Sequence, residues 1–244
     1  MRFVYMVLGP ICFLAGWEAI ARSSIAGLTV PTLSSVAEVY LQPRFAALLF
    51  RSAMTTAGSA ALGLALGTLM GAVTALIAHL VRPLRAGLDR LAVTVNAIPA
   101  IAMGPVFVLL VGREVTPVVI STIAVFFLIY VAMSSGLRNA PVNLGRMMTT
   151  FGANRWQRLR YLEIPSAIPL FLGGVKVSIT AAMIGAVIGE WFGAPSGLGI
   201  VILNTMQNFQ IPLMWAAVLL VAAIALASYG VAQIAEGLVA RRFE

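Results

Sequence analysis

The sequence predicts an all-α integral membrane protein whose helices cross the bilayer six times. Of its 244 residues, 61% are hydrophobic and only 10% are charged, and the mean hydropathy is +1.00. Lipid offers the backbone no hydrogen-bond partners, so such a chain crosses the membrane as helices or as a closed barrel. The apolar runs are long and lack the alternating pattern of barrel strands, which favours helices.

Six apolar segments are long enough to cross about 30 Å of hydrocarbon. They cover residues 3–21, 55–80, 91–111, 117–137, 169–190 and 212–234. The first has two interpretations, because its basic start, apolar run and Ala19-Ile20-Ala21 also fit a cleaved signal peptide. Its length and the presence of Trp17 and Glu18 favour a retained helix.

The six segments form one transmembrane domain over residues 1–244. Residues 1–54 hold the first helix and an outer segment, and residues 55–236 form a core with a loop at 138–168. The outer segment contains VPTLSSVAEVYLQ, which predicts a short amphipathic helix on the outer surface.

The arginines set the expected orientation. One set of alternate loops holds, together with both termini, Arg2, Arg82, Arg85, Arg90, Arg138, Arg146, Arg155, Arg158, Arg160, Arg241 and Arg242. The other set holds Arg22, Arg44, Arg51 and Arg113. The positive-inside rule places the richer set, with both termini and the loop 138–168, in the cytosol.

The composition excludes several functions. The net charge of +8 comes without a basic stripe interleaved with aromatic residues, so no nucleic-acid partner is expected. Cys12 and His79 are the only residues of their kinds, which leaves no disulfide and no metal cluster. Without GxxxxGK[ST], HExxH or GxSxG, the chain is expected to be no enzyme and to bind no cofactor.

The third span contains NAIPAIAMGP, in which Pro99 and Pro105 remove two backbone donors. Interrupted helices often line transport pathways, so Asn96, Pro99 and Pro105 are candidate pathway residues. A purely structural kink is an equal alternative. Three neutral polar residues in other spans complete the candidate set: Thr122, Ser178 and Thr180.

Small residues repeat at intervals of four in the second span and more briefly in the fifth. They are Ser59, Gly63, Gly67, Gly71 and Ala75, followed by Ala181, Gly185 and Gly189. Such a ridge lets another helix approach closely. Ordinary helix packing is the favoured interpretation.

Two charged residues lie within the fifth span. Lys176 and Glu190 are about 21 Å apart along a helix and cannot pair on it. Snorkelling to opposite interfaces is one interpretation of both residues, and it is the favoured one for Lys176. Glu190 begins EWFGAPSGLG, which predicts a tight outer loop serving either as a gate or as a turn. The candidate residues of this loop are Glu190, Gly193, Ser196, Gly197 and Gly199.

The stretch FGANRWQRLRYLEIPSAIP interrupts the apolar chain with three arginines. Read as a helix over residues 151–162, it places Trp156, Leu159 and Leu162 near one side. Pro165 is expected to end this helix, and Pro169 to begin the next span. The pattern predicts a cytosolic docking element, or alternatively a loop whose arginines only fix topology.

Here the sequence resembles a known family. Gly152 followed, after nine intervening residues, by Leu162-Glu163-Ile164-Pro165 is similar to the EAA loop of ABC importer permeases. IPAIAMGPVFVLLVG and GAVIGEWFGAPSGLG extend the resemblance to the nitrate, sulfonate and taurine type, over residues 55–234. The chain departs from that family in having Arg146-Met147-Met148 in place of Glu-Ala-Ala.

The resemblance implies the type I ABC importer permease fold in a bacterial inner membrane. It implies a homodimer that moves a sulfonate, taurine, nitrate or a vitamin precursor, delivered by an extracytoplasmic solute-binding protein. Two cytosolic ATPase subunits would bind the ATP. By resemblance, the coupling residues are Gly152, Ala153, Arg155, Trp156, Leu159 and Pro165.

Two other functions remain open from the residues alone. An ion-coupled secondary transporter would need no ATPase, but the sequence shows no acidic pair at mid-membrane. A scaffold subunit would account for the packing ridges and leave the broken third span without a purpose.

Overall fold

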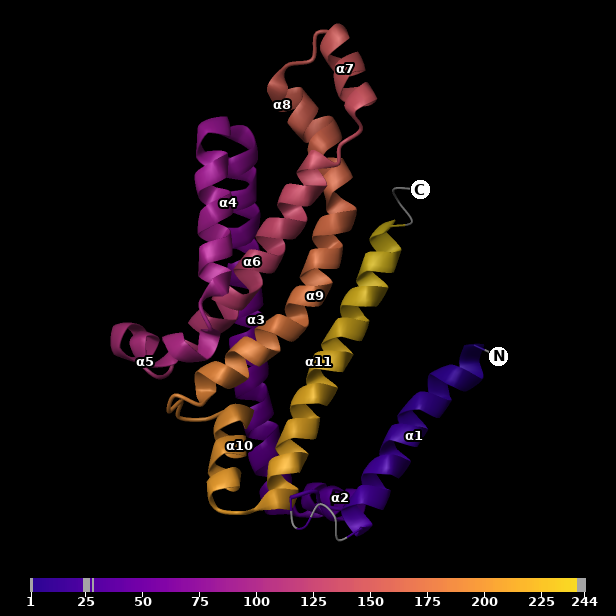
Figure 1. Ribbon diagram of the computed structural model, residues 1–244, viewed down its shortest axis with the longest axis vertical. Coiled ribbons are helices and arrows are strands. Elements are labelled where there is room, and N and C mark those ends of the chain that lie inside the picture. The colour runs from indigo at the N-terminus through magenta and orange to yellow at the C-terminus, as the bar shows by residue number, and fades with distance from the viewer. Residues whose placement is uncertain (1, 24–26, 28, 241–244) are drawn as a thin grey trace.

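The computed structural model describes residues 2–23, 27 and 29–240, and every regular element in these ranges is a helix (Figure 1). The elements are α1 (Arg2–Arg22), α2 (Leu33–Leu41), α3 (Pro43–Leu80), α4 (Arg82–Ala97), α5 (Ala100–Val111), α6 (Thr116–Arg138), α7 (Val142–Thr150), α8 (Arg155–Arg158), the π-helical turn η2 (Leu159–Glu163), α9 (Ile164–Glu190), α10 (Leu198–Gln207) and α11 (Ile211–Ala240). The predicted all-α class is confirmed.

Four helices are long and apolar enough to cross a membrane, over Pro43–Leu80, Thr116–Arg138, Arg155–Glu190 and Ile211–Leu238. The pair α4 and α5 makes a fifth span if it is counted as one broken crossing. Among the described residues, α1 is helical as predicted but lies outside this set of five.

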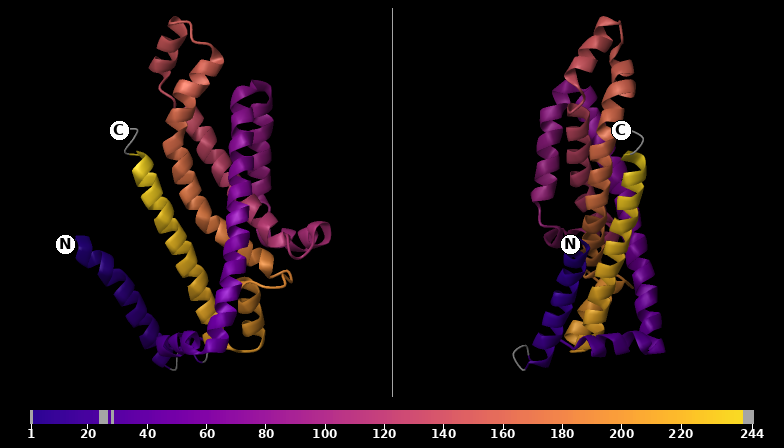
Figure 2. Two further views of the ribbon diagram at one scale, coloured as in Figure 1. Left: turned by 180° about the vertical axis from the view of Figure 1, so that it is seen from behind. Right: turned by 90° about the vertical axis from the view of Figure 1, so that its right-hand side faces the viewer.

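The bundle has two distinct ends (Figures 1 and 2). Helices α7 and α8 project at one end, called here the α8 end, while α2 and α10 lie at the opposite α10 end. Helices α1 and α11 diverge from the α10 end, and both run toward the α8 end. The first and the last described residues of the chain therefore both lie away from the α10 end.

The centre of the bundle is α6, packed between α3 and α9. A Cβ atom on Gly63 would lie 2.2 Å from Ser121 Oγ, and one on Gly67 would lie 2.6 Å from the Thr122 carbonyl oxygen. From the other side, a Cβ on Gly185 would lie 2.7 Å from Ser121 Cα. The predicted small-residue ridges are thus packing surfaces, where missing side chains let backbones touch.

The third span breaks at Pro99, as predicted. Helix α4 ends at Ala97, α5 begins at Ala100, and the two axes bend by 96°. Pro105 lies inside α5 without ending it. A Cβ on Gly104 would lie 2.1 Å from the ring of Phe192, so the turned helix packs on the loop after α9.

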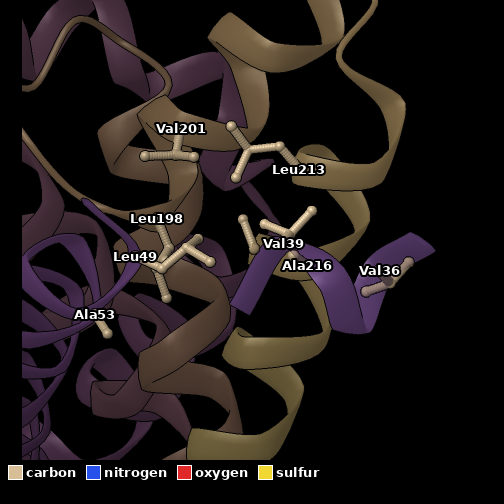
Figure 3. Close-up of a cluster of buried hydrophobic side chains, with 9 residues drawn as sticks. Val36, Val39, Leu49, Ala53, Leu198, Val201, Leu213 and Ala216 are labelled. Atoms are coloured by element: carbon tan, nitrogen blue, oxygen red, sulfur yellow. The ribbon is translucent and has the colours of Figure 1, made fainter. Parts of the chain in front are cut away.

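The short helix α2 has an apolar face, as expected, but this face packs on protein. Val36 and Val39 join a buried cluster with residues of α3, α10 and α11 (Figure 3). The hydroxyl of Tyr40 donates to the carbonyl of Ala216 at 2.6 Å. Helix α2 thereby ties the start of α3 to the start of α11.

Candidate functional site

The docking element predicted from the sequence lies at the α8 end. After α7 the chain turns at Gly152, whose φ of +83° is a conformation that favours glycine. Asn154 then caps α8. Its Oδ1 accepts from the backbone N–H of Gln157, and Gln157 Oε1 accepts from the N–H of Asn154, both at 2.8 Å.

The expected boundaries of this helix were wrong. It begins at Arg155 instead of Phe151, and Pro165 does not end it, because α8, η2 and α9 form one continuous helical segment over Arg155–Glu190. In the π turn the N–H of Ile164 donates to the carbonyl of Leu159, five residues back. This widened turn accommodates Pro165, which has no N–H to donate.

The π turn anchors the element to the bundle. Leu159 is fully buried and Leu162 nearly so, and Leu159 packs with Leu137 and Ala167 against the ends of α3 and α6. Trp156 was expected on the same side, but it is 62% exposed. It lies one turn further from the bundle, where the neighbouring helices have ended.

Polar contacts join the same element to the end of α3. Arg155 Nη2 donates to the carbonyl of His79 at 3.1 Å and also to the carbonyl of Leu80. These are terminal helix carbonyls without intrahelical partners, and a guanidinium satisfies them and complements the helix dipole. The guanidinium thus acts as a C-cap from another helix.

A second contact lies beside the first. His79 Nε2 is 2.8 Å from Glu163 Oε2, and Arg158 Nη2 is 3.3 Å from Glu163 Oε1. No sequence pattern predicted His79, Arg158 or Glu163 as site residues. His79 and Glu163 are 84 positions apart, so no local pattern indicates their contact.

The missing Glu-Ala-Ala motif falls in α7. Arg146 lines a cavity of about 280 Å³ between α7 and the bundle, together with Arg138, Arg158 and Glu163. Met147 is half-exposed, and Phe151 in the following turn is 82% exposed. The outer surface of the element is therefore both apolar and basic.

At the opposite end of the bundle, Glu190 is fully buried. It does not snorkel to an interface, because the loop after α9 folds over its carboxylate. Oε2 accepts from the backbone N–H of Gly199 at 2.7 Å. A Cβ on Gly197, whose φ is +135°, would lie 2.2 Å from the carboxylate carbon, so only glycine fits there.

The same loop is attached to α3. Thr56 Oγ1 accepts from the N–H of Leu198 at 2.8 Å, and the hydroxyls of Thr55 and Ser196 are 3.3 Å apart. Gly193 has a φ of +88°, and a Cβ on it would lie 3.5 Å from Arg113 Cδ. The predicted loop residues are thus gathered in one tight turn around Glu190.

Lys176 was expected to snorkel and instead pairs across the bundle. Its Nζ is 2.5 Å from Glu236 Oε2 on α11 and 5.7 Å from the ring centre of Tyr229. An ammonium in an apolar span is stabilised by such a partner. This ion pair joins α9 to α11.

The candidate pathway residues fall into two groups. Asn96, Pro99, Pro105 and Thr180 are exposed on the single chain, whereas Thr122 and Ser178 are buried between helices. The hydroxyl of Thr122 donates to the carbonyl of Val118 at 2.8 Å. The part of these residues in a pathway stays a prediction. A pathway between two copies of the chain would be lined by residues that are exposed on one copy alone.

Comparison with known proteins places this architecture in a family. Residues 63–244 match the family described as the binding-protein-dependent transport system inner membrane component. A Haemophilus influenzae protein named "Probable ABC transporter permease protein" is 34% identical over 185 residues, 75% of this chain and 76% of that protein. The riboflavin transport system permease protein RibX of Chloroflexus aurantiacus is 30% identical over 246 residues, 98% and 92% of the two chains.

A solved structure shares the fold. A chain of the MetNI methionine ABC transporter, in an inward-facing conformation, has a TM-score of 0.71 at 18% identity. The match covers 83% of this chain and 99% of that one. This protein belongs to the binding-protein-dependent transport inner membrane components, and it is a multi-pass permease subunit of an ABC importer.

Proposed function

We propose that residues 142–163 dock on a cytosolic ATPase subunit and that the chain works as a homodimer. In this proposal, a solute-binding protein delivers a small solute to the α10 end. The supporting observation is the combination found at α8, where exposed Phe151 and Trp156 face outward while Leu159 and Arg155 are fixed to the bundle. A displacement of the exposed surface of this element would therefore be transmitted to the helices of the bundle.

The proposed orientation puts the α8 end in the cytosol. The loops and termini expected on that side carry eleven arginines, against four on the other. The directions of α1 and α11 agree with termini on one side (Figure 1). The α10 end then faces the solute-binding protein.

Motion would pass from α8 along two routes. One is covalent, through the continuous segment Arg155–Glu190 that includes α9. The other is the cap made by Arg155 on the end of α3. Because α3 and α9 both pack on α6 through glycines, a displacement of α8 would reorient these helices together and alternate access to the pathway.

The partner would carry the chemistry. ATP binding and hydrolysis belong to the ATPase, and the permease changes conformation without covalent steps. Arg146 replaces the glutamate of the related loop and adds positive charge beside Arg138 and Arg158. The matching ATPase surface is therefore expected to carry carboxylates opposite this cavity.

Co-purification tests the proposal. The chain, tagged at its C-terminus, is extracted gently from its native host, and proteins recovered in stoichiometric amount are identified by mass spectrometry. We expect an ATPase with a Walker motif that is lost with Trp156→Ala and retained with Leu109→Ala, a matched exposed apolar residue on α5. Recovery of a well-folded chain alone, even after crosslinking, would refute the docking role.

The solute class is a separate part of the proposal. Candidates from the family resemblance are sulfonates, taurine, nitrate and vitamin precursors, and one relative is named for riboflavin. The candidate pathway residues are neutral and do not select among these. A charged recess at the α10 end is more informative.

A further inference from the structure

A recess of about 710 Å³ lies between the first turns of α3 and helix α10. Its polar lining residues are Arg44, Arg51, Ser52, Ser196, Asn204, Thr205, Asn208 and Gln210. This volume is within the range of small-molecule sites, about 300–1,000 Å³. We infer that the recess receives the anionic head group of a small organic solute at the outer face of the permease.

The inference deepens the proposed function and rests on it for orientation. Its first support is charge. Arg44 and Arg51 are seven residues apart on α3, which puts them on one face of the helix and about 10 Å apart along its axis. Neither takes part in an ion pair within the described part of the chain, and no acidic residue lines the recess.

Guanidinium groups suit the inferred ligand. Their planar donors bind a carboxylate, sulfonate or phosphate through two parallel hydrogen bonds, and they remain charged at every physiological pH. Because no carboxylate lines the recess, the two arginines give it a positive potential. Such a potential attracts anions and raises their local concentration.

The remaining lining defines the rest of the ligand. Asn204 on α10 and Asn208, the residue that caps its C-terminus one turn later, offer neutral amides beside the arginines. Phe45, Leu48 and Leu213 add apolar surface to the same recess. The combination fits a small amphiphilic anion that has a charged head and a short hydrocarbon body.

The topology of the chain gives a second, independent support. The proposed outer segments hold only Arg22, Arg44, Arg51 and Arg113, because arginine on that side opposes the preferred orientation. Two of these four line one recess.

The recess also adjoins the loop that Glu190 holds in place. Ser196 lines it and contacts Thr55, while Ser52 lines it and its backbone carbonyl accepts from the hydroxyl of Thr56. Thr56 in turn holds the start of α10 at Leu198. An anion bound here would contact both helices that meet at this loop.

The potential is measured with a charged probe. In a Cys12→Ser background, Asn204→Cys places a reporter thiol in the recess, and Ala37→Cys places a matched one on the exposed surface of α2 outside it. Labelling rates are compared for the anionic methanethiosulfonate ethylsulfonate and the cationic trimethylammonium analogue. The full chain, with any subunits that co-purify, is kept in phosphatidylcholine nanodiscs.

We expect the anionic reagent to be favoured at residue 204 by roughly tenfold relative to residue 37. Arg44→Gln with Arg51→Gln should abolish the preference, whereas Arg44→Lys with Arg51→Lys should keep it. Size-exclusion profiles check that each variant remains folded. Equal anion preference at the two positions would overturn the inference.

Competition identifies the source of the anion. Ethanesulfonate at millimolar concentration should slow labelling at residue 204, whereas the neutral, similarly sized ethyl methyl sulfone should not. A lipid head group is the other possible source. If only added phosphatidylglycerol protects the thiol, and ethanesulfonate does not, the solute site is refuted and the recess binds lipid.

This measurement is independent of the ATPase. Failure of the charge or competition assay leaves the docking role of α8 untouched. Loss of the ATPase in co-purification likewise leaves the charge of the recess unchanged. The two proposals can therefore fail separately.

Discussion

His79 and Glu163 meet with 2.8 Å between Nε2 and Oε2, so the end of α3 contacts the π turn that joins α8 to α9. Arg155 donates to the backbone of the same end of α3. The exposed side chains of α8 and the side chains that anchor it to the bundle are thus different ones. This separation allows docking and transmission to be tested separately.

The first prediction uses that separation. Arg155→Ala should leave the ATPase bound, because the exposed ring of Trp156 is intact, but should lower ATP-driven solute uptake several-fold. Trp156→Ala should lose the ATPase itself. Uptake in proteoliposomes and pull-down of the ATPase are measured on the same preparations. Normal uptake by Arg155→Ala would show that its cap on α3 transmits nothing.

Gly152 provides a test of backbone conformation. Its φ of +83° is adopted at little cost by glycine and by asparagine, whereas a β-branched residue is strained there. Gly152→Val should abolish ATPase docking while membrane insertion stays normal, and Gly152→Asn should retain most of it. Because a Cβ at this position meets nothing within 4 Å, equal losses in the two variants would argue against a conformational cause.

The packing of α3 on α6 leads to a stability prediction. Gly67→Ala places a Cβ 2.6 Å from the Thr122 carbonyl oxygen, so the helices must separate. Gly58→Ala on the same helix meets no atom within 4 Å and should be neutral, or stabilise by up to about 1 kcal/mol through helix propensity. Thermal unfolding in detergent should show a lower Tm for Gly67→Ala alone. A similar Tm for both variants would contradict the close packing.

Much of this fold follows from sequence patterns. Long apolar runs predict the four unbroken spans, Pro99 predicts the broken one, and glycines such as Gly67 predict close packing. These signals are local or strictly periodic. A π turn leaves no periodic signal, so the sequence did not predict that α8 continues past Pro165.

The contacts that define the sites are harder to predict. Lys176 and Glu236 are 60 positions apart, and each alone resembles an interfacial residue that reaches toward water. In the sequence, Glu190 stands at the start of a predicted exposed loop. In the structure this loop folds over Glu190 and buries it. Pairing between distant spans depends on how helices are arranged, which hydropathy does not determine.

The buried carboxylate of Glu190 leads to a graded prediction. Glu190→Gln keeps an oxygen that can accept from the N–H of Gly199, so the loop should persist with only a small loss of stability. Glu190→Leu leaves that buried N–H without an acceptor, at a cost of about 1–3 kcal/mol. Labelling of Ser196→Cys in a Cys12→Ser background reports loop opening, and it should rise for Glu190→Leu only. An equal rise in labelling for both variants would instead indicate that the negative charge is essential.

The ion pair between Lys176 and Glu236 yields the last prediction. Removing one charge leaves the other in an apolar span without its partner, so Lys176→Met and Glu236→Gln should each lower the Tm. The double variant removes both charges and should recover much of the loss, because no unpaired charge remains. Thermal unfolding of the four proteins forms a double-mutant cycle. If the single losses simply add in the double variant, the two residues do not interact and α9 is not joined to α11 at this point.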